Sequence, residues 1–271
     1  DNYQWIPGYD QYWLEANGQP IGKVVSGFWD TSYSGVLYTY SKVTGTQTKL
    51  QAMQKAVNSF IDSVAAKKDG DKAVDHKIGI VKFSGNDTYK SGGYTYNYTQ
   101  VLEGLTDVTT GATQLKRSVD SLKAAGCTSA DYGMEKASDI LNTREGDDAN
   151  RPAVVIMFTD GEPTRKRDYN KTVAGAAVNA AKVLKDKGIK VYTIGMFGDA
   201  KPSDTSNKFN QYMHGVSSNY PNAVNDKKSS SGVNLGTRAS GNYYFAAANA
   251  GELDKIFQSI GQEVSSLKLD V

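Results

Sequence analysis

Three short segments of this sequence carry side-chain oxygens of the kind that bind a hard metal ion. The first holds Asp30, Ser32 and Ser34 at alternating positions, so one tight turn can direct all three side chains to one point. The second segment contains Thr128, and the third contains Asp160 directly after an apolar run. Two carboxylates and three hydroxyls suit a divalent cation, with Mg²⁺ as the first choice and Mn²⁺ or Ca²⁺ as alternatives.

The elements that must position these oxygens can be predicted from the spacing of apolar residues. Five stretches have apolar residues at helical spacing, and β-favouring runs alternate with them. The predicted helices are 49–66, 113–125, 130–141, 173–187 and 252–267. The predicted strands are 23–30, 77–83, 153–159, 190–196 and 242–247. This alternation predicts an α/β fold, with a doubly wound, mostly parallel central sheet flanked by helices in a Rossmann-like arrangement.

The three oxygen-bearing segments fall at one predicted edge of that sheet. Asp30 ends the first predicted strand, Asp160 follows the most apolar strand, and Thr128 lies between two predicted helices. In a doubly wound sheet, ligands bind outside the carboxyl ends of the strands, where the strand order reverses. We therefore expect one site at that edge.

Three stretches rich in Gly, Ser, Thr, Asn and Tyr interrupt the alternation. They are 35–48, 84–111 and 197–241, and they are predicted to be long loops or insertions, which in compact domains are usually functional. Alternating tyrosines at 94, 96 and 98 are compatible with either a hairpin face or a binding surface. Residues 1–22 are expected to extend a single domain whose core runs from about 23 to 267.

Composition excludes several classes of protein. The net charge of +2, from 31 Lys+Arg and 29 Asp+Glu, argues against a nucleic-acid binder and against attachment to an acidic membrane. The single cysteine, Cys127, excludes an intrachain disulfide and a cysteine-based zinc site. His76 and His214 are far apart, and His214 lies in a predicted loop, so histidine-based chemistry is disfavoured. The sequence contains no apolar run of about 18 residues, so it predicts no membrane span. The start of the chain has no leader pattern, so we expect a cytosolic protein or a mature or excised piece of an exported one.

The Asp-x-Ser-x-Ser turn, the Gly-x-Thr loop and the Asp-Gly after a hydrophobic strand resemble the von Willebrand factor A domain with its metal-ion-dependent adhesion site. The resemblance runs from about residue 23 to 267, with the motifs in the family's order. It implies that Ser32, Ser34 and Thr128 ligate through hydroxyls, and that Asp30 and Asp160 act directly or through water. An acidic side chain of a partner would complete the coordination. The inserted loops are similar to those of Gram-positive surface proteins, particularly pilus-tip adhesins.

Each motif also has a purely structural interpretation. Asp-x-Ser-x-Ser and Thr-Asp-Gly-Glu are common turn sequences, and Thr128 or Ser129 could cap the following helix. Asp131 is either an outer partner of the metal ligands or a favourable acid in the first turn of a helix. The basic residues 165–167 either attract an acidic ligand or form a solvated charge cluster.

Three functions remain as hypotheses. The resemblance implies a non-enzymatic adhesion module on a bacterial surface or pilus, which binds a host matrix or cell-surface protein through the cation. Its neighbours would then be other pilus or cell-wall-anchored domains. One alternative is an intracellular A-type domain that serves as an assembly scaffold. A metal-dependent hydrolase is less favoured, because the sequence has no well-placed general base and no Gly-rich phosphate loop.

Overall fold

The computed structural model describes residues 11–14, 20–24, 48–69, 72–85, 88–91, 93–166 and 168–266 of the chain. The chain divides into two compact units, Asp1–Thr46 and Gln47–Val271. In the first unit, β1 (Gln11–Leu14) pairs antiparallel with β2 (Pro20–Val24). The predicted strand 23–30 is therefore described only at its first two residues, which belong to β2. Asp30, Ser32, Ser34 and residues 35–47 of the predicted insertion 35–48 lie outside the described residues.

The second unit contains a parallel sheet whose middle strand is β10 (Lys190–Gly195). β9 (Val154–Thr159) pairs with it on one side and β13 (Tyr244–Ala246) on the other, both in parallel. β5 (Lys77–Lys82) and β8 (Gln100–Asp107) form an antiparallel pair. The three parallel strands are those predicted at 153–159, 190–196 and 242–247, with ends that differ by at most two residues.

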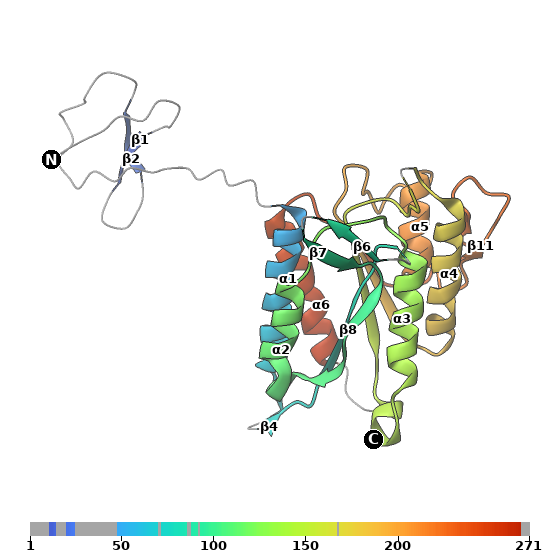
Figure 1. Cartoon of the computed structure of the whole chain (residues 1–271), viewed down its shortest axis with the longest axis horizontal. Coiled ribbons are helices and arrows are strands. Elements are labelled where there is room, and N and C mark those ends of the chain that lie inside the picture. The colour runs from blue at the N-terminus through green and yellow to red at the C-terminus, as the bar shows by residue number, and fades with distance from the viewer. Residues whose placement is uncertain are drawn as a thin grey trace. The chain divides into compact units, whose positions relative to one another are not determined.

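Helices cover both faces of the sheet (Figure 1). One layer contains α1 (Lys49–Ala65), α2 (Val108–Asp120) and α6 (Ala250–Ser266). The other layer contains α3 (Ala130–Asn142), α4 (Lys171–Asp186) and α5 (Lys208–Val216). Successive residues of β10 enter the two layers in turn: Val191 packs in the α3–α5 core, and Tyr192 packs in the α1–α2–α6 core. The parallel sheet is thus covered by helices on both faces, which confirms the predicted α/β fold.

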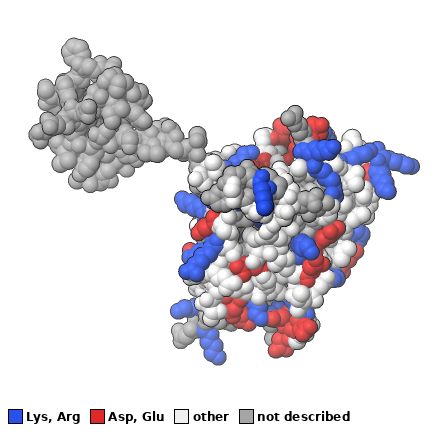
Figure 2. Space-filling view, viewed as in Figure 1, with Lys and Arg blue, Asp and Glu red and all other residues white. Residues whose placement is uncertain are grey.

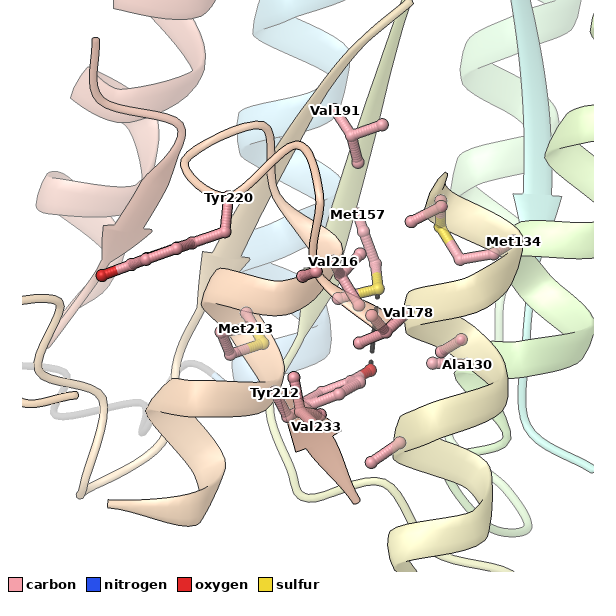
Figure 3. Close-up of a cluster of buried hydrophobic side chains, with 14 of the residues drawn as sticks. Ala130, Met134, Met157, Val178, Val191, Tyr212, Met213, Val216, Tyr220 and Val233 are labelled. Carbon is pink, nitrogen blue, oxygen red and sulfur yellow. Dashed lines mark hydrogen bonds between the residues drawn. The ribbon is translucent and has the colours of Figure 1, made fainter. Parts of the chain in front are cut away.

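The core beneath α3, α4 and α5 is close-packed and almost entirely apolar (Figure 3). Alanines on the buried face of α4 allow close approach of α3, and larger side chains from α5 fill the remaining space. The one polar contact drawn in this core joins the Tyr212 hydroxyl to the Met157 sulfur at 3.7 Å. Burial raises the pKa of Tyr212, so the hydroxyl keeps its proton.

The stretch 84–111 is not the long loop that its composition predicted. It contains β6 (Thr88–Ser91) and β7 (Tyr94–Asn97), which form an antiparallel hairpin, followed by β8 and the start of α2. The alternating tyrosines at 94 and 96 therefore lie in a hairpin strand, where Tyr and Thr are favoured. α2 begins at Val108, before the predicted start, because Asp107 caps it through the backbone N–H of Thr109 at 2.7 Å.

The stretch 197–241 is also partly ordered into regular elements. It contains α5 and the short antiparallel pair of β11 (Val224–Asn225) and β12 (Val233–Asn234). Elsewhere, β3 (Lys68–Asp69) pairs with β4 (Lys72–Ala73), and residues Gly146–Asn150 form a 3₁₀ turn. None of the helices in the described residues is both long and apolar enough to cross a membrane.

A buried lysine ties α4 to the end of α5. The Lys185 ammonium donates to the backbone oxygens of Gly215, Tyr220 and Ser217 at 2.7, 2.9 and 3.2 Å. The last carbonyls of a helix have no partner within it, and a cation there also opposes the helix dipole. Burial lowers the pKa of Lys185 to about 7.

His214 lies in α5 and is buried, so its predicted loop position is wrong. Its Nε2 is 2.7 Å from the Pro202 carbonyl oxygen, and its Nδ1 is 3.1 Å from the Asn219 side-chain nitrogen. The Asn219 side-chain oxygen accepts from the backbone N–H of Tyr243 at 2.8 Å, which fixes the amide orientation. His214 is therefore neutral, with Nε2 donating and Nδ1 accepting. Burial, aided by Arg238, lowers its pKa.

Candidate metal site

A tight turn at the carboxyl end of β9 presents Asp160. The Thr159 hydroxyl donates to the Gly161 carbonyl at 2.9 Å and accepts from the Gly161 N–H at 3.3 Å, which closes the turn on itself. The Asp160 side chain is exposed and makes no hydrogen bond or ion pair with another described residue. Its carboxylate is thus available to a ligand at the edge of the sheet.

Thr128 lies beside this turn. A Cβ built on Gly161 would be 3.7 Å from the Thr128 hydroxyl oxygen. The backbone of Thr128 exchanges two hydrogen bonds with Thr164, at 3.1 and 3.3 Å, and the next residue, Ser129, donates to the Ser84 carbonyl at 2.7 Å. The structure therefore brings Thr128 and the Asp160–Gly161 turn together, as their order along the chain predicted.

The hydroxyls before α3 do not serve as helix caps, so that alternative interpretation is wrong. Ser129 occupies the N-cap position but makes no side-chain capping hydrogen bond. Among the described residues, none is hydrogen-bonded to the hydroxyl of Thr128. The Thr128 hydroxyl is left free to bind something else.

The beginning of α1 reaches the same edge of the sheet. Thr48 caps α1 by a reciprocal pair of hydrogen bonds with Gln51, at 3.1 and 2.9 Å. The Lys49 ammonium then donates to the backbone oxygen of Asp160 at 3.2 Å. Asp30, Ser32 and Ser34 precede this helix in the sequence, but their positions are outside the described residues.

Arg165 is held by the first turn of α3. It contacts the Asp131 carboxylate oxygen Oδ2 at 2.6 Å and the Tyr132 hydroxyl at 2.6 Å, with its guanidinium 4.8 Å from the centre of the Tyr132 ring. The Asp131 side chain is only 4 % exposed, and burial raises its pKa while Arg165 opposes this. Sequence reasoning found Asp131 and Arg165 as separate candidates, but their pairing depends on tertiary structure.

A cavity of about 160 Å³ lies close to the same turn. It is lined by Glu162, Phe197, Gly198, Asp199 and Phe209. Neither carboxylate has an ion-pair partner among the described residues. The two phenyl rings pack edge to face, with centroids 6.4 Å apart. Sequence reasoning missed this feature, because its walls come from three segments distant in the chain.

The described oxygens fit a hard cation but do not complete its coordination. Thr128 supplies a hydroxyl and Asp160 a carboxylate, the ligand types that Mg²⁺ prefers. Within the described part of the chain, no group of three His, Cys, Asp or Glu residues could hold a metal ion by itself. Thr128 and Asp160 are therefore the two predicted ligands that the described residues bring together.

Figure 2 shows that basic and acidic side chains are interspersed over the face in view. No broad area of a single sign covers the described residues on that face. The mixed charge of this face agrees with the near-zero net charge of the chain.

The fold and this edge define an α/β domain that presents hydroxyl and carboxylate oxygens beyond the carboxyl end of a parallel sheet. The sequence model of the von Willebrand factor type A domain matches residues 30–258, which is more than half of the chain. The chain belongs to the von Willebrand factor type A domain family. No curated protein sequence matches it.

Solved structures of bacterial pilus proteins share the fold. The pilus adhesin SpaC from Lactobacillus rhamnosus GG, in its open conformation, superposes with a TM-score of 0.55 at 17 % identity, over 82 % of this chain and 28 % of SpaC. A variant of the PilB minor pilin from Streptococcus sanguinis superposes with a TM-score of 0.54 at 13 % identity, over 83 % of this chain and 56 % of PilB. The chain thus spans less than two thirds of the length of these proteins.

Proposed function

We propose that this chain is a non-enzymatic adhesion module that binds a protein ligand through a divalent cation, with Mg²⁺ as the first choice. Its metal ligands are Asp30, Ser32, Ser34, Thr128 and Asp160. One observation carries the proposal: the free Thr128 hydroxyl lies beside the turn that presents the free Asp160 carboxylate.

Several contacts of the chain prepare this edge for binding. The Thr159 hydroxyl holds the turn, the backbone bonds to Thr164 hold Thr128, and Lys49 holds the backbone of Asp160. Because the backbone that carries these side chains is already held, less conformational entropy is lost when a ligand binds. When bound, the cation supplies an open coordination position for a carboxylate of the partner.

The partner is proposed to be a host extracellular-matrix or cell-surface protein, and the neighbours to be pilus or cell-wall-anchored domains. The likeness of the fold to SpaC and PilB supports a location on the bacterial surface. An enzymatic role has less support, because His214 has both ring nitrogens engaged in the core and cannot act as a general base at this edge.

The proposal is tested by calorimetric titration of the full chain with Mg²⁺. The variants are Asp160→Asn and Thr128→Val, and the matched control is Asp199→Asn, which removes another exposed carboxylate. We expect affinity to fall at least about tenfold in both site variants and to stay unchanged in the control. Wild-type affinity in both site variants would refute the assignment.

The ligand side is tested separately with fibronectin and collagen as probes, in Mg²⁺ and after chelation with EDTA. Binding that requires Mg²⁺ and is lost in Asp160→Asn supports a metal bridge. Binding that survives both EDTA and Asp160→Asn contradicts it.

A further inference from the structure

The buried carboxylate of Asp131 has only half of its hydrogen bonding in place. Oδ2 is paired with Arg165 at 2.6 Å, but Oδ1 is buried and makes no hydrogen bond of standard geometry. The backbone N–H groups of Asp131 and Tyr132 lie near enough to the carboxyl to lower its pKa, which offsets only part of the effect of burial. The side chain is only 4 % exposed, so bulk water does not compensate. Buried polar atoms in proteins are nearly always bonded, and an exception calls for a physical cause such as a bound ion or water.

The contacts around Asp131 lead back to the candidate metal site. Asp131 belongs to the first turn of α3, and side chains in a helix lean toward its N-terminus, which here is the Thr128–Ser129 end. Arg165 follows Thr164, whose backbone bonds to Thr128. The ion pair and these backbone bonds therefore link residues 128–131 to residues 164–165 at both ends.

We propose that Asp131 is a positioning residue of the cation site, outside the set of direct ligands. Its Oδ1 accepts a hydrogen bond from the coordination sphere of the cation, either from a bound water or from a ligand hydroxyl. Arg165 keeps Oδ2 occupied and so fixes the direction of Oδ1. This inference rests on the proposed function. Outer carboxylates of this kind orient the ligands of metals and raise affinity.

The test is a calorimetric Mg²⁺ titration of the full chain carrying Asp131→Asn or Arg165→Gln. In Asp131→Asn the amide oxygen faces Arg165, so the amide nitrogen replaces the acceptor Oδ1 with a donor. The matched control is Asp139→Asn, which breaks an exposed ion pair with Lys136 in the same helix. We expect an affinity loss of roughly 10–100-fold for Asp131→Asn and none for the control.

Arg165→Gln separates positioning from simple electrostatics. Removal of a positive charge near a cation site should raise Mg²⁺ affinity if only charge matters. Positioning predicts the opposite, a loss of affinity, because the Asp131 carboxylate is no longer held. A gain in Arg165→Gln overturns the inference. Unchanged Mg²⁺ affinity in either variant also overturns it. If such a variant only unfolds at a lower temperature in the absence of metal, the ion pair has a purely structural role.

Asp160→Asn in the same titration shows which proposal has failed. If Asp160→Asn loses Mg²⁺ while Asp131→Asn and Arg165→Gln keep it, only the role of Asp131 is wrong. If the wild type binds no Mg²⁺, or Asp160→Asn binds as well as the wild type, the proposed function falls and this inference falls with it.

Discussion

Gly126 begins the loop that carries Thr128, and its replacement by Ala tests how tightly that loop is built. Its φ is +78°, in the left-handed region that residues with a Cβ avoid. A Cβ at this position would also lie within 3.0 Å of the Ser84 hydroxyl oxygen and of the Tyr98 ring. Gly126→Ala therefore adds backbone strain and steric overlap at the same point.

The expected cost is the sum of these two effects. A left-handed conformation costs a residue with a side chain roughly 1–2 kcal/mol. Overpacking by a methyl group adds about 1–3 kcal/mol, so Gly126→Ala should destabilise the fold by about 2–5 kcal/mol. For a domain of this size, each kcal/mol lowers the unfolding temperature by about 2–4 °C, which gives a fall of roughly 4–20 °C.

Gly188→Ala is the matched control, because it has the strain without the overlap. Gly188 has φ +76° just after α4, and nothing lies within 4 Å of its Cβ position. The unfolding temperature of Gly188→Ala should fall by only about 2–8 °C. Thermal unfolding of both variants, followed by circular dichroism, measures the difference.

A Mg²⁺ titration of the same two variants links the loop to the site. Gly126→Ala should also weaken Mg²⁺ binding, because the loop that holds Thr128 must move, while Gly188→Ala should not. Equal falls in unfolding temperature for the two variants would refute the packing argument. Unchanged Mg²⁺ affinity in a destabilised Gly126→Ala would separate the loop from metal binding.

Lys185 and His214 give further predictions for how stability depends on pH. Lys185→Met removes the donor to three backbone carbonyls at the end of α5 and should cost about 2–4 kcal/mol in urea unfolding. The cost should be larger at pH 9 than at pH 6, because the native amine, with a pKa of about 7, has released a proton that the unfolded chain keeps up to pH 10.5. Equal stability of variant and wild type at both pH values would contradict this. Because the pKa of His214 is lowered from 6.5, the wild type should lose stability as pH falls below 6.5, where the unfolded chain binds the proton more tightly. His214→Gln should lack that part of the pH dependence, and parallel curves for the two proteins would show that the imidazole does not titrate on unfolding.

The helices and parallel strands could be predicted because their burial is periodic along the sequence. In β9 and β10 most residues enter one core or the other, so both strands are rich in apolar residues. The carboxyl ends of such strands share one edge of the sheet, which is why Thr128 and Asp160 could be expected together. The pairing of Asp131 with Arg165 could not be predicted, since it depends on how the turn after β9 packs on α3.

Two errors have a common cause, which is that polar composition was taken as the sign of a long loop or insertion. In the hairpin of β6 and β7, Thr88, Lys90 and Thr95 are exposed, so no hydrophobic alternation marks the strands. α5 contains polar residues, but its Tyr212 and Met213 side chains are buried in the core. The sequence does not show that a polar residue of α5 such as His214 can be buried. The structure shows that it is buried with both ring nitrogens matched by partners.

His214 and Asp131 are both buried, but they differ in how far their polar atoms find partners. His214 is buried with both ring nitrogens matched by fixed partners, and its role is complete within the fold. Asp131 is equally buried, but one of its oxygens is unmatched, and the free Thr128 hydroxyl and free Asp160 carboxylate lie along the same edge. Natural folds break their own rules of polar satisfaction mainly at functional sites. A ligand at this edge would complete that bonding, and the Mg²⁺ titrations of Asp131→Asn and Arg165→Gln test whether one does.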